Sequence, residues 1–217
     1  MSALRLEGVA HAMGEGAARR AVLAKADRAF VPGRFACLTG PSGAGKTTML
    51  SILAGVVLPE EGVVRHGAVA VSALGEAGRL DWRRRQVGMV FQTNRLIDIL
   101  TVDEHLQMVA RLRGRPEAVA AGRDWLVRLG LADKGSQRPG QLSGGEKARV
   151  ALAQALAVEP AVLLADEPTA ALDRANAEMV AAALHTYAER EGRIVVAVSH
   201  DAAMIGAAHD EVRLEKA

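Results

Sequence analysis

A glycine-rich segment in the first quarter of the chain has the residue types and spacing of a phosphate-binding loop. It runs from Gly40 through Lys46 to Thr47 and fits the pattern G-x-x-x-x-G-K-[ST]. Its glycines let the backbone curl so that N–H groups face an anion, and a following helix adds its positive end. We expect this loop to bind a nucleoside triphosphate, with Lys46 on the β and γ phosphates and Thr47 on Mg²⁺. The expected phosphate-binding set is Gly40, Pro41, Ser42, Gly43, Ala44, Gly45, Lys46, Thr47 and Thr48.

Two acids, Asp166 and Glu167, follow directly after the apolar run 162–165. Ligands of doubly wound sheets bind at the carboxyl ends of the strands, so Asp166 is expected to face the loop and hold Mg²⁺. Glu167 is then placed to orient an attacking water or to accept its proton. Alone, such a pair is more often a helix cap or a solvated turn. The phosphate loop makes the catalytic interpretation the better one.

A third segment, Ser143-Gly-Gly-Glu146, has the pattern of a capped helix start with two bare glycines. Helix N-termini attract anions, so this segment is a second candidate anion site. The capping box needs no ligand, however, and the spacing alone favours an ordinary helix cap.

Taken together, these segments resemble the nucleotide-binding subunit of ATP-binding-cassette (ABC) transporters. The resemblance covers essentially the whole chain, through GPSGAGKTT, LSGGE, VLLADEP, ALD and a late SH in the order of that family. It implies an ATPase that uses ATP and Mg²⁺. It disfavours a kinase or GTPase, which would lack LSGGE and the late histidine.

The resemblance also assigns roles to single residues. Gln92 resembles the glutamine that senses Mg²⁺ and water, and its alternative is a polar residue at a strand end. His200 resembles the switch histidine at the γ-phosphate, where a lone histidine would usually be structural. Asp173 resembles the aspartate that communicates across a dimer, and it can also cap the next helix. The signature that contacts the γ-phosphate of the opposite subunit is Ser143, Gly144 and Gly145.

In this family two subunits enclose two ATP molecules head to tail, so we expect a homodimer and separate integral membrane permease subunits. The longest uncharged stretch, 47–59, is too short to cross a bilayer, and the start has no signal-peptide core. The expected location is cytoplasmic, on the inner face of the membrane. The compact form, without a regulatory domain after His200, is similar to ATPases of lipoprotein release, macrolide export and cell division. The alternative is a soluble accessory ATPase of a multi-enzyme complex.

Composition points to one departure from the family. Aromatic residues make up 3% of the chain, and none precedes Phe30. Many family members have an aromatic residue near the N-terminus that stacks on adenine. Met13 or its neighbour His11 occupies that region here, so we expect a weaker base contact and relaxed discrimination between ATP and GTP.

Charge and cysteine content exclude other classes. The formal charge of +2 is too balanced to indicate a nucleic-acid partner, and Cys37 alone can form neither an internal disulfide nor a Cys-rich metal site. The basic cluster Arg83–Arg85 is either a solvated helix face or a contact for an acidic partner or lipid head groups. Gln154 stands where the family commonly has arginine, and we attach no consequence to it.

The pattern of elements predicts an α/β fold. Strands alternating with helices imply a mainly parallel sheet, and the resemblance specifies a P-loop NTPase core with N-terminal antiparallel strands. We expect a single domain, 1–217, with a core at 1–92 and 159–217 and an inserted α-helical subdomain at 93–158. The expected strands are 4–8, 22–30, 34–38, 63–71 with an interruption at Gly67, 87–91, 161–165, 194–199 and 212–214. The expected helices are 101–113, 116–130, 143–158, 175–191 and 201–208, with one more beginning at 46.

Overall fold

The computed structural model describes residues 2–14, 19–93 and 95–217, which form two sheets and seven α-helices within those ranges. The strands are β1 (Leu4–Met13), β2 (Arg20–Phe30), β3 (Arg34–Thr39), β4 (Glu61–His66), β5 (Val69–Ala70), β6 (Val87–Val90), β7 (Val162–Asp166), β8 (Ile194–Val198) and β9 (Asp210–Arg213). The α-helices are α1 (Lys46–Leu53), α2 (Glu76–Gln86), α3 (Val102–Arg113), α4 (Ala118–Arg128), α5 (Gly144–Ala157), α6 (Arg174–Ala188) and α7 (Ala202–Ala207). Short 3₁₀ helices are η2 (Val71–Ala73) and η3 (Pro139–Gln141).

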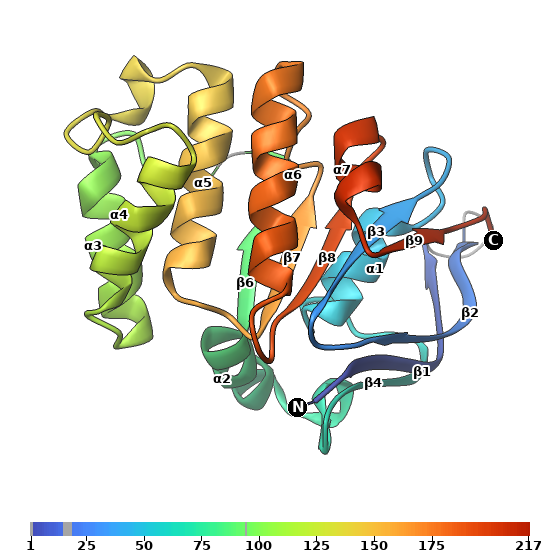
Figure 1. Ribbon diagram of the computed structural model, residues 1–217. Coiled ribbons are helices and arrows are strands. Elements are labelled where there is room, and N and C mark those ends of the chain that lie inside the picture. The colour runs from blue at the N-terminus through green and yellow to red at the C-terminus, as the bar shows by residue number, and fades with distance from the viewer. Residues whose placement is uncertain (1, 15–18, 94) are drawn as a thin grey trace.

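The two sheets differ in strand direction, as expected. The first has the order β2-β1-β4-β5 and is antiparallel throughout. The second has the order β6-β7-β8-β3-β9, and every pair in it is parallel. Because parallel strands share one direction, the ends of β3, β7 and β8 meet at one edge of the sheet, where the candidate residues follow (Figure 1).

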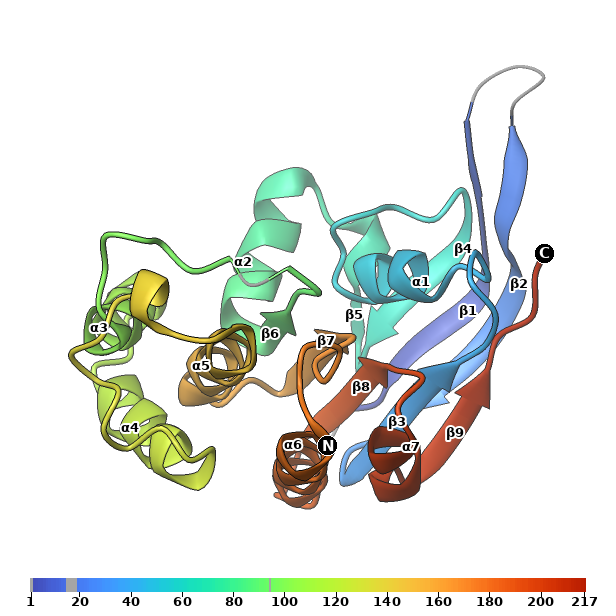
Figure 2. The same ribbon diagram turned by 90° about the horizontal axis from the view of Figure 1, so that it is seen from above.

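Helix α1 lies between the two sheets (Figure 2). Its apolar side chains, including Ile52 and Leu53, are fully buried against both sheets. Alternate residues of the parallel strands, such as Leu164 and Val196, point to this side. The start of α1, which carries the expected phosphate loop, is therefore fixed from two sides.

The opposite face of the parallel sheet packs against the helices α3 to α7. Leu163, Val195 and Cys37 point to this face and belong to one buried cluster with residues of those helices. Trp125 of α4 and Tyr187 of α6 pack edge to face with ring centroids 6.0 Å apart, which joins the 93–158 segment to the sheet layer. Among the described residues, no helix is both long and apolar enough to cross a bilayer.

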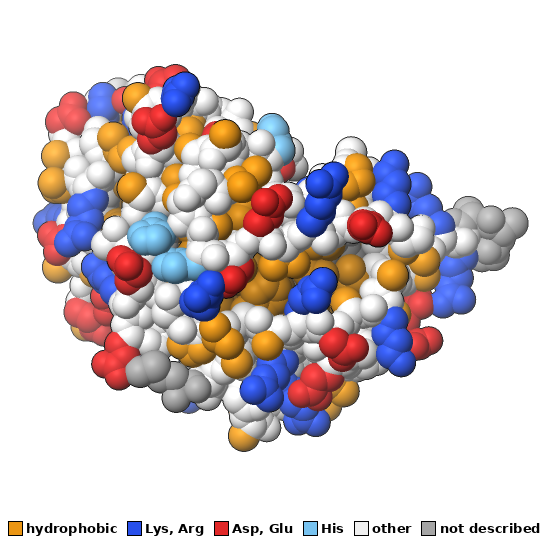
Figure 3. Space-filling model, turned by 45° about the vertical axis from the view of Figure 1, so that its right-hand side comes forward, with side chains coloured by type: hydrophobic (Ala, Val, Ile, Leu, Met, Phe, Trp, Pro, Cys, Tyr) orange, Lys and Arg blue, Asp and Glu red, His pale blue; other side chains and the backbone are white. Residues whose placement is uncertain are grey.

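The edges of the two sheets diverge on one side of the molecule. Strands β2 and β9 leave a cleft of about 500 Å³ between them. On the face drawn in Figure 3, hydrophobic side chains lie in a central hollow that acidic and basic side chains border. None of the residues expected to do chemistry lines this cleft.

The strand expected at 63–71 is interrupted at Gly67, as its glycine suggests: β4 ends before Gly67, whose φ of 59° makes a turn into β5. Helix α2 was not predicted as an element. Its N-cap, Gly75, offers no side-chain cap, and Trp82 is its one buried residue, so it lacks a capping side chain and an apolar stripe, although Glu76 in its first turn and Arg83–Arg85 in its last turn suit a helix.

Candidate active site

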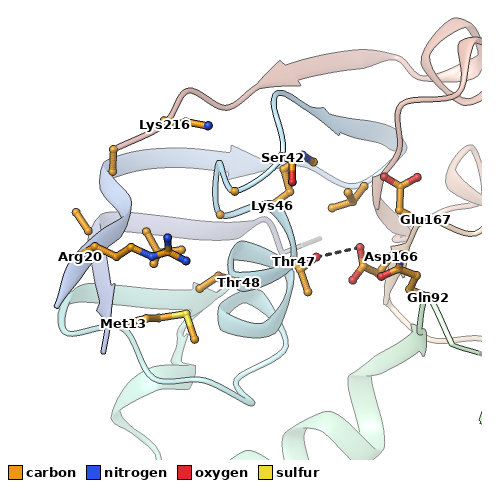
Figure 4. A pocket seen from close by; sticks show the side chains of 16 residues that line it. Met13, Arg20, Ser42, Lys46, Thr47, Thr48, Gln92, Asp166, Glu167 and Lys216 are labelled. Atoms are coloured by element: carbon orange, nitrogen blue, oxygen red, sulfur yellow. Dashed lines mark hydrogen bonds between the residues drawn. The ribbon is translucent and has the colours of Figure 1, made fainter. Parts of the chain in front are cut away.

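Most of the expected site residues line one cavity of about 660 Å³ at the carboxyl edge of the parallel sheet (Figure 4). Its walls are the loop after β3, the start of α1, the ends of β6 and β7, and the facing ends of β1 and β2. The volume is that of an ordinary cofactor pocket. The expected residues that line it are Met13, Ser42, Gly43, Gly45, Lys46, Thr47, Thr48, Gln92, Asp166 and Glu167.

Two glycines of the loop are sterically required. Gly45 caps α1 with a φ of 81°, and a Cβ there would lie 2.3 Å from the carbonyl oxygen of Val22. Gly40 has a φ of 136°, and a Cβ there would lie 2.3 Å from the carbonyl oxygen of Leu214. The loop can therefore reach β2 and the C-terminal segment only with bare backbone at these positions.

The side chain of Lys46 folds back onto the phosphate loop. Its Nζ donates to the carbonyl oxygens of Gly40 at 2.8 Å and Pro41 at 2.9 Å. Ala44 is buried and closes the inner side of the loop. The ammonium group therefore lies beside the open backbone at the start of α1, where the helix end adds positive potential.

Asp166 lies directly opposite the first turn of α1. Thr47 Oγ1 donates to Asp166 Oδ1 at 3.2 Å (Figure 4). Burial raises the pKa of Asp166, the Thr47 hydrogen bond acts against that rise, and the charge of Glu167 adds to it. The side chains of Thr47, Asp166 and Gln92 together offer hard oxygen atoms, the ligand type that Mg²⁺ prefers, so the residues fit this ion.

Glu167 and His200, which the sequence analysis singled out separately, touch each other. Because a carboxylate can only accept, His200 Nδ1–H donates to Glu167 Oε1 at 3.1 Å. The same Nδ1 lies 3.1 Å from Glu167 Oε2, a buried oxygen that makes no hydrogen bond of its own among the described residues. Glu167 also has a φ of 47°, held by its N–H bond to the Val198 carbonyl at 2.9 Å. A carboxylate at the cavity wall can accept a proton from a bound water or orient it.

The signature segment lies elsewhere. Ser143 Oγ accepts from the Glu146 N–H at 3.2 Å, and Glu146 Oε2 accepts from the Ser143 N–H at 2.8 Å, which completes the expected capping box of α5. Neither Ser143 nor the two glycines after it line the cavity. Helices α5 and α1 pack on opposite faces of the parallel sheet, so the start of α5 does not contact the cavity of its own chain.

Asp173 caps α6, one of the two roles considered for it. Its Oδ1 accepts from the Asn176 N–H at 2.9 Å, and hydrogen bonds from Asn176 lower the pKa of Asp173. A Cβ added to Gly145 would lie 3.0 Å from Leu172 Cδ2, so the signature and the Asp173 turn are neighbours. A role across a dimer stays a prediction.

The structure adds two cations that sequence reasoning missed. Arg20 and Lys216 line the cavity together with Met13, whereas His11 does not line it. Arg20 is the cross-strand partner of Met13. No local signal marks either cation, because their positions depend on hairpin register and on the path of the last residues.

The basic cluster of α2 is in part the solvated helix face considered for it, because Arg84 and Arg85 are exposed, and a contact with a partner stays a prediction. Arg83 Nη1 donates to the Gly55 carbonyl at 2.6 Å, and Arg84 Nε donates to the Leu112 carbonyl at 2.8 Å. Arg85 pairs with Asp81 at 3.0 Å on the helix surface. Two of the three arginines therefore connect α2 to its neighbours within the fold.

Comparison with known proteins agrees with this arrangement. A protein-family model described as ABC transporter matches residues 15–170. The chain belongs to the ABC transporter family. The ATP-binding protein LolD 1 of the lipoprotein-releasing system of Rhodospirillum rubrum is 40% identical over 203 residues, which are 92% of this chain and 89% of that protein. An uncharacterized ABC transporter ATP-binding protein of Mycobacterium tuberculosis is 40% identical over 176 residues, and the chain spans 53% of its length.

Solved structures of an ABC cassette share the fold. The dimeric structure of the bacterial ABC transporter cassette MJ0796 matches with a TM-score of 0.90 at 31% identity, over 97% of this chain and 94% of that one. A dimeric post-hydrolysis state of MJ0796 bound to ADP and Pi matches with a TM-score of 0.88 at 30% identity, over 98% and 94%. The predicted fold class and family are thus confirmed, and the chain is an ABC ATPase.

Proposed function

We propose that two copies of this ABC ATPase enclose two ATP molecules head to tail and drive a separate membrane permease. One observation carries the proposal: the cavity of one chain has the loop and the acids, while the signature helix begins outside it. A second chain, turned about a two-fold axis, can supply the missing helix start to each cavity. The dimeric MJ0796 structures support this assembly.

Within one cavity the residues divide the work. Lys46 and the N–H groups at the start of α1 bind the β and γ phosphates. Thr47, Asp166 and Gln92 would hold Mg²⁺, which would neutralise charge on the triphosphate. Glu167 orients the attacking water and accepts its proton. His200 positions the Glu167 carboxylate and, being 82% exposed, is free to contact the γ-phosphate.

The second copy would complete the site. Its Ser143, Gly144 and Gly145 bring the positive end of α5 to the γ-phosphate. The turn at Asp173 packs beside this signature, so it can report on closure of the dimer. Loss of the γ-phosphate would remove the contact between the chains and open the dimer.

A surface beside Gln92 suits a permease. Leu80, Phe91 and Leu112 are large apolar residues that are 59%, 38% and 62% exposed, and they line one groove of about 660 Å³ between α2, β6 and α3. Because Phe91 precedes Gln92 directly, a segment seated there would sense the nucleotide. We propose that a cytoplasmic segment of a permease binds this groove, that the helical subdomain 93–158 moves with it, and that the ATPase is thereby held at the inner face of the membrane.

The variant Glu167→Gln tests the assembly. It removes the proton acceptor but keeps the shape, so it should bind ATP, lose hydrolysis and elute as a dimer in size-exclusion chromatography with saturating ATP. Lys46→Ala should stay monomeric because it lacks the phosphate contact. If Glu167→Gln remains monomeric with ATP bound, the head-to-tail sandwich is wrong.

The partner separates transport from the alternative role in a soluble multi-enzyme complex. Purification of the wild-type chain from its own cells should recover an integral membrane protein. The double variant Leu80→Asp with Leu112→Asp should lose that protein and keep basal ATPase activity. Recovery of a purely soluble complex would support the alternative.

A further inference from the structure

One wall of the proposed nucleotide cavity lies beyond the residues that bind the phosphates. The phosphate end of a nucleotide is fixed at Lys46 and the first turn of α1, but the cavity continues past the loop to the ends of β1 and β2. A purine base is flat and apolar on its faces, so it needs a flat or polarizable group to pack against. None of the sixteen lining residues is aromatic.

Strand register brings Arg20 and Met13 together on that wall. They are directly opposed in the antiparallel pair of β1 and β2, so their side chains lie on the same face of the ribbon. Both reach into the cavity in Figure 4. Met13 is 54% exposed, and Arg20 is exposed as well, so both side chains have room to cover a ligand.

The position of Arg20 along β2 matches the length of a nucleotide. Val22 contacts the phosphate loop: a Cβ added to Gly45 would lie only 2.3 Å from the Val22 carbonyl oxygen. Arg20 is two residues earlier on the same face, about 7 Å along the strand. That separation leaves room for the sugar between the phosphates and the base.

We propose that Arg20 binds the base of the nucleotide by stacking its planar guanidinium on the purine face, beside the Met13 thioether. The inference rests on the proposed nucleotide site. A guanidinium stacks well on aromatic faces, and a thioether packs against ring edges. Because stacking does not read exocyclic groups, Arg20 binds adenine and guanine alike.

The test measures binding of ADP, GDP and inorganic pyrophosphate to the full chain by competition against a fluorescent nucleotide. Arg20→Ala should weaken ADP and GDP by the same factor, about three- to thirtyfold, and leave pyrophosphate unchanged. Arg20→Lys keeps the charge but loses the plane, so it should lose most of the same affinity. Arg19→Ala is the matched control, since Arg19 pairs with Glu60 at 2.6 Å and does not line the cavity.

Three results would overturn the proposal. If Arg20→Ala weakens the binding of pyrophosphate by the same factor, Arg20 contacts the phosphates and not the base. If Arg20→Lys binds ADP and GDP with wild-type affinity, the charge of Arg20 matters and its planar group does not. A loss confined to GDP would indicate hydrogen bonds to the guanine edge instead of stacking. Lys46→Ala should weaken all three ligands, and if it weakens none, the proposed nucleotide site fails independently of Arg20.

Discussion

The single residues of the site are arranged for a ligand rather than for stability. Asp166 is half-buried beside Thr47, and its environment opposes its charge. Glu167 keeps a left-handed backbone, and its buried Oε2 makes no hydrogen bond of its own in the part of the chain that the structure describes. Such features are unfavourable in the free protein and become useful when a cation or a water arrives.

Asp166→Asn should stabilise the protein in the absence of nucleotide and Mg²⁺. Because the folded-state pKa of Asp166 is raised above its unfolded value, ionisation opposes folding. That penalty is absent below the unfolded pKa and complete above the folded pKa, so it acts at pH 7. The amide removes it and can still accept from Thr47. We expect the Tm to rise by about 2–4 °C in a calorimetric scan, while ATP hydrolysis is lost.

Asp210→Asn is the control of opposite sign. Hydrogen bonds from Arg34, at 2.6 Å to each oxygen, lower the pKa of Asp210. Its stabilising contribution is present above the unfolded pKa and is lost as pH falls through the folded pKa. This variant should therefore lower the Tm at pH 7. If Asp166→Asn also lowers the Tm, the ionised Asp166 carboxylate does not destabilise the fold.

At the scale of elements, structure that depends on local signals could be predicted from the sequence, and structure that depends on long-range contacts could not. The helices with capping boxes could be predicted closely: 101–113 was expected and α3 is Val102–Arg113, because Thr101 and Glu104 form the cap among themselves. The phosphate loop and the acids were likewise contiguous in sequence. Helix α2 lacks a side-chain cap, and the pairing of Arg20 with Met13 depends on register across a turn. The start of α2 is therefore not marked by a capping residue, and the Arg20–Met13 pairing is not marked by any residue pattern within β2.

Two arginines connect helices α2 and α3. Arg84 donates to the Leu112 carbonyl, and Arg113 donates to the carbonyl oxygens of Arg83 and Arg84, and to that of Val87 at 2.8 Å. The Arg83 carbonyl also accepts from the Val87 N–H, so Arg113 reinforces the end of α2 and the start of β6. Burial, with the charges of Arg115 and Arg84, lowers the pKa of Arg113, and the hydrogen bonds to the carbonyl oxygens offset part of the cost of burying its charge.

Arg113→Met should therefore lower the free energy of unfolding by about 1–3 kcal/mol in urea titrations, because it removes the hydrogen bonds from α3 to the end of α2 and the start of β6. Arg111→Met on the same helix is the control. Arg111 is exposed, and its replacement should change the free energy by less than about 0.5 kcal/mol. Equal effects of the two substitutions would show that the contacts of Arg113 to α2 contribute nothing.

At the scale of the whole molecule, the residues that we propose for one reaction are divided between two faces of the sheet. Lys46, Asp166 and Glu167 belong to the cavity, and Ser143 belongs to the exposed start of α5. In a head-to-tail dimer each site then takes its loop and acids from one chain and its signature from the other. When one chain carries a defect in its loop and the other carries a defect in its signature, both defects therefore fall in the same site and the second site is intact.

Mixed dimers turn this division into a measurement. Lys46→Ala and Ser143→Arg should each abolish ATPase activity as pure proteins. Because Lys46→Ala is not expected to dimerise with itself, at least half of the dimers in an equal mixture are mixed, and each mixed dimer has one site with both defects and one intact site. If a single intact site suffices, the mixture should regain about a quarter to a half of wild-type activity. Lys46→Ala mixed with Glu167→Gln is the control, because both residues belong to the cavity of their own chain and no site is intact. Recovery in this control, or none in the first mixture, would contradict the division of each site between two chains.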